Sequence, residues 1–196
     1  MDWQPLPTTA VWEHYEARQA VEVLFTETDV DGVVLRGTTT GVERERPWSM
    51  DYVLTTDPAW HTRSLQAHLR DEDGDRCVTL SRTSAGRWLI NGQLEPALDG
   101  CLDVDLDCSA GTNTLPVHRL PLLGPAAVPI PAAFVRISGP PQVTRLEQTY
   151  GKPSPPDDHG LHTVPYTSST FDIALQLTYD ASGLITDYPG LARRLA

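Results

Sequence analysis

The chain has 196 residues, a formal net charge of −11 and one lysine, Lys152. This charge argues against nucleic acids and anionic membranes as partners, because a protein that binds either of them needs a positively charged stripe on its surface. The arginines of this chain cluster only at Arg44/Arg46 and Arg193/Arg194. A chain of this length buries a full hydrophobic core without disulfides or metals, and we expect one domain over residues 1–196.

The three cysteines, Cys77, Cys101 and Cys108, form an odd number and contain no C-x-x-C pair. This usage is typical of reduced thiols in a cytosolic protein. The first thirty residues have neither the basic segment nor the continuous apolar segment of a signal peptide. Apolar runs are also shorter than the roughly 18 residues of a membrane-spanning helix. We therefore expect a cytoplasmic protein without a membrane span.

The N-terminal half shows the alternation of apolar and polar residues that predicts β-strands. Residues 19–28 alternate up to a turn signal at residues 29–32, and residues 33–36 continue the pattern, which predicts a hairpin. The next alternating segment, residues 48–54, places on one face Trp48, Met50, Tyr52 and Leu54.

Three further segments predict an antiparallel meander, at residues 63–69, 77–82 and 87–90. In the first of them one face carries Arg63, Leu65, Ala67 and Leu69. Asn91-Gly92 is the strongest hairpin signal of the chain, because both residues tolerate a positive φ. We expect residues 101–108 to be the next strand of this meander.

The C-terminal half is rich in proline, with seven prolines between residues 116 and 141 that exclude a long helix. Alternation predicts strands at residues 132–137, 142–150, 171–179 and 184–188, and a surface loop at residues 151–160. Helical turns are expected at most in residues 191–196 and in the first dozen residues. The whole pattern predicts an all-β fold, a single antiparallel β-roll or barrel-like domain with little helix.

Residues 98–123 contain the densest group of reactive side chains. If residues 101–108 form a strand, one face carries Leu102, Val104 and Leu106 and the other carries Cys101, Asp103, Asp105 and Asp107. A D-x-D-x-D run also begins a calcium-binding EF-hand loop, but Cys108 replaces its glycine and Thr114 its final glutamate, so we expect no metal site. A solvated or arginine-neutralised strand face is the favoured interpretation.

Asp99, Cys101, Cys108 and His118 have the chemistry of a zinc site or of an activated thiol. The two cysteines are seven residues apart on an alternating strand, so they point to opposite faces. Like charges beside Cys101 would raise the pKa of its thiol, the opposite of what a nucleophile needs. We therefore expect no cofactor and no catalytic cysteine.

Arg63, Arg87 and Arg119 lie on segments that the meander places near the acidic strand. If they point inward to Asp103 and Asp105, a cavity for water or a polar ligand head explains the network best, because buried charge pairs add little stability. If they point outward, they form ordinary surface ion pairs. The sequence leaves both arrangements open.

Six segments together resemble a known bacterial family: residues 60–63 (WHTR), 86–88 (GRW), 98–106 (LDGCLDVDL), 112–120 (TNTLPVHRL), 183–185 (GLI) and 188–191 (YPGL). The family is the one labelled putative glycolipid-binding, formerly a domain of unknown function, and the resemblance runs over residues 12–194. It implies a β-roll or barrel similar to periplasmic lipoprotein carriers, which hold acyl chains in an open cavity, and it implies no catalytic residues. The chain departs from the family pattern at two places. Residues 108–111 (CSAG) stand where the family more often has a turn that contains proline and phenylalanine, and His61 stands where an arginine is common.

Three functions follow as hypotheses. The first is non-enzymatic binding of a glycolipid or another amphiphilic small molecule, with candidate ligand-binding residues Trp60, Arg63, Trp88, Asp103, Asp105, Asn113, Arg119 and Tyr188. The second is a small enzyme acting on a polar metabolite, with Asp103 or Asp105 as general base and Arg63 or Arg119 as anion clamp. The third is an oligomeric structural or interaction domain. The sequence indicates no particular oligomeric state.

Overall fold

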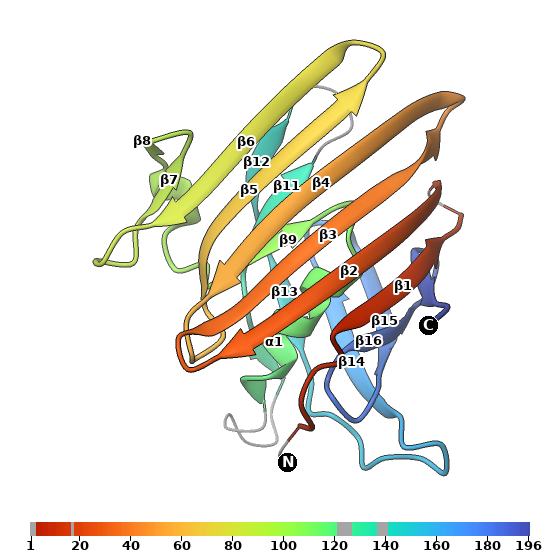
Figure 1. Cartoon of the computed structure of the whole chain (residues 1–196). Coiled ribbons are helices and arrows are strands. Elements are labelled where there is room, and N and C mark those ends of the chain that lie inside the picture. The colour runs from red at the N-terminus through yellow and green to blue at the C-terminus, as the bar shows by residue number, and fades with distance from the viewer. Residues whose placement is uncertain (1–2, 17, 121–126, 137–140) are drawn as a thin grey trace.

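The computed structural model describes residues 3–16, 18–120, 127–136 and 141–196. A 14-stranded sheet dominates it, and Figure 1 shows the long strands β2 to β6 in front with the strands of a second, smaller sheet behind them. In spatial order the strands of the large sheet are β10 (Val128–Pro129), β13 (Gln148–Tyr150), β14 (His162–Ser168), β15 (Ile173–Tyr179), β16 (Ile185–Tyr188), β17 (Ala192–Arg194), β1 (Thr9–His14), β2 (Gln19–Asp29), β3 (Gly32–Glu43), β4 (Arg46–Thr56), β5 (Thr62–Asp71), β6 (Gly74–Arg82), β7 (Trp88–Ile90) and β8 (Gln93–Leu94).

The predicted all-β fold and its hairpins are confirmed. From β1 to β8 each strand pairs antiparallel with the next one in the chain. The predicted apolar face of β4 is buried at Met50, Tyr52 and Leu54. Asn91 and Gly92 form the tight turn between β7 and β8 with φ values of 48° and 80°.

The acidic strand leaves the meander, contrary to the expectation that it would continue it. β9 (Asp103–Leu106) belongs to a three-stranded sheet with β11 (Ala132–Arg136) and β12 (Gln142–Leu146), and it pairs with β11 in parallel. The 3-10 turn η1 (Pro96–Leu98) and Gly100, with φ 88°, redirect the chain after β8. The small sheet thereby packs against the large one: the N–H of Thr62 at the start of β5 donates to the carbonyl of Leu102, and the Thr62 hydroxyl accepts from the N–H of Val104 in β9.

The segment that leads to Arg119 is helical and is not a strand of the predicted meander. It forms a 3-10 turn η2 (Gly111–Asn113) followed by the single-turn helix α1 (Thr114–Val117). Pro116 fits because the first turn of a helix has no intrahelical partner for the missing N–H. Arg119 follows directly after this turn and is thereby aimed back at β9.

The two termini are strands, so the helical turns expected there are wrong. β17 pairs with β1, and the register of this pair joins Trp12 to Arg194. Sequence reading also missed β14, because Pro165 lies in the middle of it. The predicted strand at residues 142–150 is divided at Glu147 into β12 of the small sheet and β13 of the large one.

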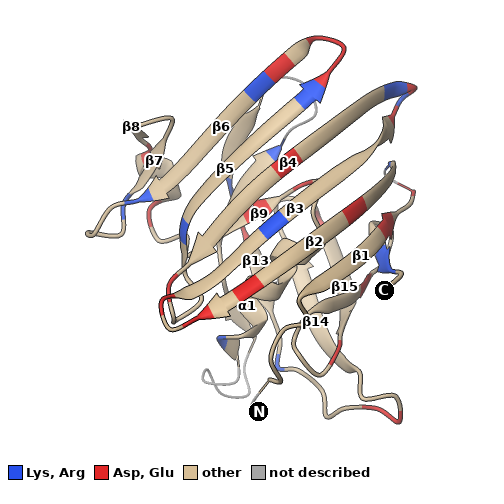
Figure 2. Ribbon diagram, viewed as in Figure 1, with Lys and Arg blue, Asp and Glu red and all other residues tan. Residues whose placement is uncertain are grey.

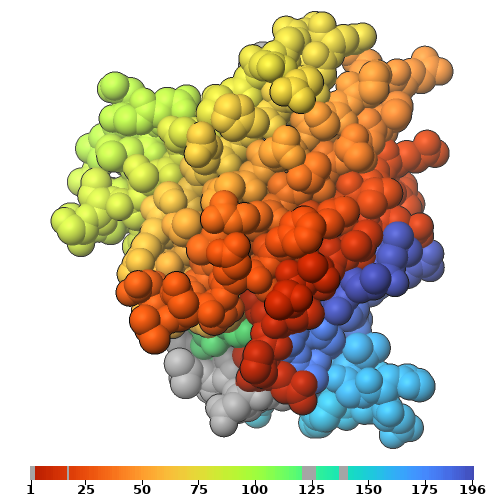
Figure 3. All heavy atoms as spheres, viewed as in Figure 1, coloured from red at the N-terminus to blue at the C-terminus, as the bar shows by residue number. Residues whose placement is uncertain are grey.

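The inner face of the large sheet, the small sheet and α1 enclose one hydrophobic core. Its largest fully buried side chains include Trp12, Trp88, Tyr150, Tyr166 and Tyr179. In Figure 3 the outer face of β1 to β6 is continuously covered by side chains. The interior at β9 is filled by packed side chains, since Val104 and Leu106 belong to the core and are 0% and 1% exposed. None of the helices in the described ranges is long and apolar enough to cross a membrane.

Candidate functional site

The most deeply buried charge of the acidic strand is neutralised by an arginine. Nη1 of Arg119 lies 2.8 Å from Oδ1 of Asp103, and Nη2 lies 2.5 Å from Oδ2. Nη1 also donates to the carbonyl oxygens of Trp60 and Leu115, at 2.7 and 3.3 Å. Asp103 is 1% exposed, so the two charges neutralise each other inside the protein. Their hydrogen bonds connect the segment after α1 to β9 and to the β4–β5 loop.

The other two arginines lie outside. β4 and β5 change register at Thr56, so that Thr55 faces Ser64, Thr56 faces Thr62 and Arg63 is the extra residue of a bulge. The bulge turns Thr62 inward and leaves Arg63 exposed, although alternation placed Arg63 on the buried face.

Arg87 pairs with Asp99 at 2.7 Å, and both side chains are more than 40% exposed. Of the three arginines, Arg119 thus faces inward and the other two face outward. Of the two arginines predicted as an anion clamp, Arg119 thus lies on Asp103 and Arg63 lies away from it, and a catalytic role for Asp103 or Asp105 stays a prediction.

Asp105 lies on the side of β9 that faces the tyrosines of the C-terminal strands, and its Oδ1 accepts a hydrogen bond from Thr112 at 3.0 Å. Burial raises the pKa of Asp105 to about 7, with smaller contributions from Asp107 and Asp103. The carboxyl is therefore largely protonated below neutral pH in the folded protein.

Asp105→Asn is expected to stabilise the protein at pH 8 and to change little at pH 4. In the unfolded chain the carboxyl ionises near pH 4, so the folded state loses stability as the pH rises from about 4 to the folded pKa of about 7. The amide removes this loss, of the order of 4 kcal/mol at pH 8, since the pKa values of the folded and unfolded states differ by about three units. Urea unfolding at both pH values tests this, with the exposed Asp158→Asn as control; a gain independent of pH would contradict it.

Trp60 and Trp88 are both held by the fold. Trp60 stacks on His118 with ring centres 3.5 Å apart and an interplanar angle of 9°. Burial, and secondarily Arg119, lowers the pKa of His118 to about 3, so its imidazole is neutral. The indole of Trp88 is fully buried and donates to the carbonyl of Cys101 at 2.9 Å.

Asn113 and Tyr188 border the tyrosine cluster near Asp105. The side-chain oxygen of Asn113 accepts from Tyr150 at 3.2 Å, and its carbonyl accepts from Tyr179 at 3.3 Å. The ring of Tyr188 lies 5.9 Å from that of Tyr166. Seven of the eight candidate residues thus lie in buried or partly buried contacts of the fold, and Arg63 is exposed and apart from them. That any of them binds a ligand stays a prediction.

The cysteines of the acidic strand are both buried, and burial raises the pKa of Cys101 to about 11. The predicted direction is right, but burial is the main cause and the carboxylates of Glu147 and Asp103 add less. Within the described ranges, groups of three or more His, Cys, Asp or Glu side chains that could hold a metal ion are absent.

A buried glutamate that sequence analysis missed anchors the turn after β9 to the large sheet. Oε1 of Glu22 accepts from the hydroxyls of Ser109 and Tyr52 at 2.5 and 3.1 Å, and Oε2 accepts from the N–H of Ala110 at 2.7 Å. Nε2 of His14 lies 3.3 Å from Oε2.

The alternation of β2 gave no signal for this anchor. Glu22 is fully buried and shares the inner face of β2 with Leu24, whereas Val21 and Phe25 are exposed. The tyrosine reaches the carboxylate because it passes over Gly37, where a Cβ would lie 2.1 Å from the Tyr52 ring.

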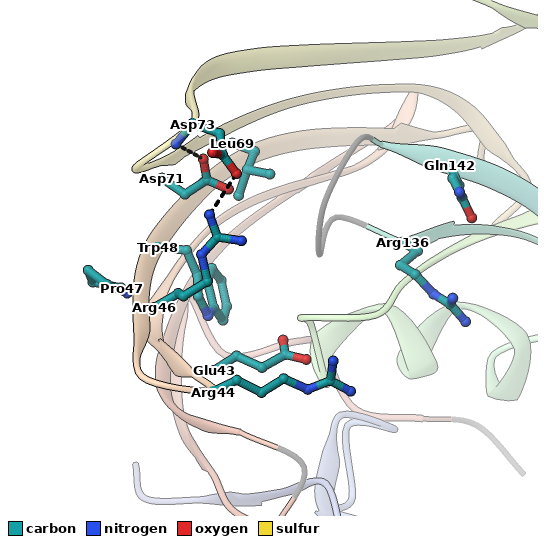
Figure 4. A pocket seen from close by; sticks show the side chains of 10 residues that line it. All are labelled: Glu43, Arg44, Arg46, Pro47, Trp48, Leu69, Asp71, Asp73, Arg136 and Gln142. Carbon is teal, nitrogen blue, oxygen red and sulfur yellow. Dashed lines mark hydrogen bonds and ion pairs between the residues drawn. The ribbon is translucent and has the colours of Figure 1, made fainter.

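A groove of about 410 Å³ lies at the end of the large sheet where the β3–β4 and β5–β6 turns face the small sheet. Figure 3 shows these turns as separate projections, in orange and yellow, and Figure 2 shows that both carry charges of either sign. Trp48 and Leu69 supply apolar surface. In Figure 4, Glu43 and Arg44 extend into the groove from one wall, and Arg136 and Gln142 lie on the facing wall.

Trp48 is supported from the protein side by Arg18. The guanidinium carbon of Arg18 lies 5.7 Å from the centre of the Trp48 ring, and its Nη2 lies 3.7 Å from Oδ2 of Asp107. The side chains of Arg18 and Asp107 are 9% and 8% exposed, so this support is built into the fold. Asp107, the residue that follows β9, is thereby connected to the groove through the arginine that packs on Trp48.

A smaller slot of about 170 Å³ lies beside Arg119 and is lined mainly by Leu102 and residues 128–131. It is less than half the size of the groove, whose volume falls in the range of roughly 300–1,000 Å³ usual for small-molecule sites. Sequence analysis did not list the groove residues as a site. One signal was available in the sequence: Trp48 lies at the end of an alternating strand, next to the Arg44/Arg46 cluster.

Comparisons with known proteins place the chain among β-proteins of unassigned function. A family model described as "Putative glycolipid-binding" matches residues 9–194. The crystal structure of a DUF1089 family protein from Pseudomonas aeruginosa is 27% identical, with a TM-score of 0.72 over 100% of this chain and 97% of that chain. A beta-barrel-like DUF1849 protein from Brucella abortus is 11% identical, with a TM-score of 0.53 over 98% and 96%. A search of curated proteins finds no match.

Proposed function

Because the chain belongs to the family described as "Putative glycolipid-binding", we propose that it binds a glycolipid or a similar amphiphile in the groove between the β3–β4 turn, the β5–β6 turn and the small sheet. The bound molecule would place its sugar against Trp48 and its polar groups against the charged rim. Binding requires no catalytic step.

The observation that carries this proposal is the composition of the groove. Trp48 and Leu69 offer an apolar surface beside carboxylate, guanidinium and amide groups of the rim, which suits a molecule that is partly apolar and rich in hydroxyls. The space around β9, in contrast, is occupied by the Asp103–Arg119 pair and by packed tyrosines. A ligand at the groove would displace water and leave the core unchanged.

Trp48→Ala is expected to weaken binding of octyl β-D-glucoside at least tenfold, because the variant loses the aromatic surface that the sugar would cover. Isothermal titration calorimetry below the critical micelle concentration measures this. Phe25→Ala is the matched control, since Phe25 is an aromatic residue on the outer face of β2 with 52% exposure. Equal affinity of the Trp48 variant and the wild type, or failure of the wild type to bind, would contradict the proposed function.

A further inference from the structure

Two arginines of the groove have no partner among the residues that the structure describes. Arg44 and Arg136 come from facing walls, and within the described residues neither guanidinium has an ion pair or a hydrogen bond. The third arginine of the groove differs from them, because Arg46 forms ion pairs with Glu72 and, at 2.9 Å, with Asp73.

The carboxylates of the groove likewise divide into those with an arginine partner and one without. Asp71 is bound by Arg76, and Asp73 by Arg46. Glu43 remains as an acceptor without a partner in the described chain. The lining as a whole is balanced, with three arginines and three carboxylates, but its charged side chains without a described partner are two arginines and one carboxylate.

The backbone at Arg44 is strained in a way that a glycine-containing turn would avoid. Arg44 and Glu45 form the two-residue turn between β3 and β4 with φ values of 50° and 66°. The turn between β7 and β8 adopts the same left-handed region with Asn91 and Gly92, the residues that tolerate it best. An arginine in this position is therefore better explained by what its side chain does in the groove than by the stability of the turn.

We propose that the groove selects an acidic head group, a sugar that carries a carboxylate or another anion, which Arg44 and Arg136 bind from opposite sides. This inference rests on the proposed function and specifies its ligand class. The guanidinium groups offer paired N–H donors that match a carboxylate, and Glu43 accepts hydroxyl groups of the same sugar. Trp48 then lies under the apolar face of the ring.

Three probes test the inference by calorimetry at pH 7: octyl β-D-glucuronide, octyl β-D-glucoside and free glucuronate. We expect the octyl glucuronide to bind about tenfold to a hundredfold more tightly than the octyl glucoside, with an advantage that shrinks as salt is raised. Equal binding of the two octyl glycosides would overturn the inference and leave the proposed function standing. If free glucuronate binds as tightly as its octyl glycoside, the acidic head group is supported and the amphiphile is contradicted. Absence of binding by all three would contradict both.

Two sets of variants locate the anion contact. Arg136→Gln should lower affinity for the octyl glucuronide about tenfold and leave affinity for the octyl glucoside within twofold. Arg36→Gln removes the same charge from the outer face of β3, where Arg36 is 51% exposed, and should change neither affinity. An equal loss in the Arg36 variant would show a general charge effect and overturn the inference.

The combined change Arg44→Asn with Glu45→Gly separates binding from folding. It supplies the preferred residues for the turn and should raise the melting temperature by about 2–4 °C while lowering affinity for the octyl glucuronide about tenfold. A protein that is more stable and still binds the octyl glucuronide with wild-type affinity would exclude Arg44 from the site and overturn the inference.

Discussion

Glu22→Leu is expected to lower the free energy of unfolding by about 2–6 kcal/mol, since it leaves two buried donors without an acceptor at about 1–3 kcal/mol each. The donors to Glu22 are the N–H of Ala110 and the hydroxyls of Ser109 and Tyr52, and the two hydroxyls, 3.0 Å apart, can satisfy only one of their two protons between them. A loss of this size is a large part of the stability of a typical domain, which is about 5–15 kcal/mol. Urea unfolding followed by tryptophan fluorescence measures it.

Glu22→Gln provides a variant that should fold. It keeps one carbonyl oxygen and the shape of the side chain, so its loss should be about half as large or less. Glu27→Leu is the control on the same strand, because the Glu27 side chain is 67% exposed, and it should change stability by no more than about 0.5 kcal/mol. Similar losses in the Glu22 and Glu27 variants would show that the buried carboxylate does not anchor the turn.

Arg119→Met should destabilise the protein by about 3–5 kcal/mol, because it leaves the carboxylate of Asp103 buried without its cation. The double variant Asp103→Leu with Arg119→Met should recover most of this loss, since a buried ion pair replaced by apolar groups of similar volume is often neutral. The comparison of single and double variants by urea unfolding measures the coupling between the two residues.

Arg63→Met is the matched control for Arg119→Met, because Arg63 lies on the bulge of β5 and is exposed. It should leave the unfolding curve unchanged within about 0.5 kcal/mol. A large loss at Arg63, or a double variant at Asp103 and Arg119 no more stable than Arg119→Met, would contradict the assignment of the buried pair.

Alternation was sufficient to predict the hairpins of the large sheet, because each long strand has one face in the core and a period of two residues. The same rule failed at Arg63, where one extra residue in β5 exchanges the two faces. It also failed for β14, because a proline in the middle of the strand masked the pattern. Local sequence patterns identify strands, but they do not reveal a β-bulge or a strand that contains a proline.

The position of β9 depends on tertiary contacts that alternation cannot supply. Its parallel pairing with β11 joins segments about 30 residues apart, and Arg119 reaches Asp103 from a helical turn. Glu22 is likewise recognisable as buried only when its donors on the segment after β9 are in place. That residues 1–196 form one domain stays a prediction, which expects a single unfolding transition.

The groove was not predicted because its walls come from the β3–β4 turn, the β5–β6 turn and the small sheet, which are distant in the chain. The resemblance predicted the family correctly, and the family model over residues 9–194 confirms it. Neither specifies where a ligand lies. The proposed location therefore depends on Trp48, Arg44 and Arg136, whose side chains line the groove and form no ion pair with other described residues.

We propose that the amphiphile binds in the groove and not around β9, and amide NMR of the ¹⁵N-labelled protein titrated with octyl β-D-glucoside distinguishes the two positions. Binding in the groove should give the largest shift changes at Glu43, Arg44 and Trp48 and on the facing wall at Arg136 and Gln142. Shift changes centred instead on Trp60, Asp103, Asn113, Arg119 and Tyr188 would contradict it.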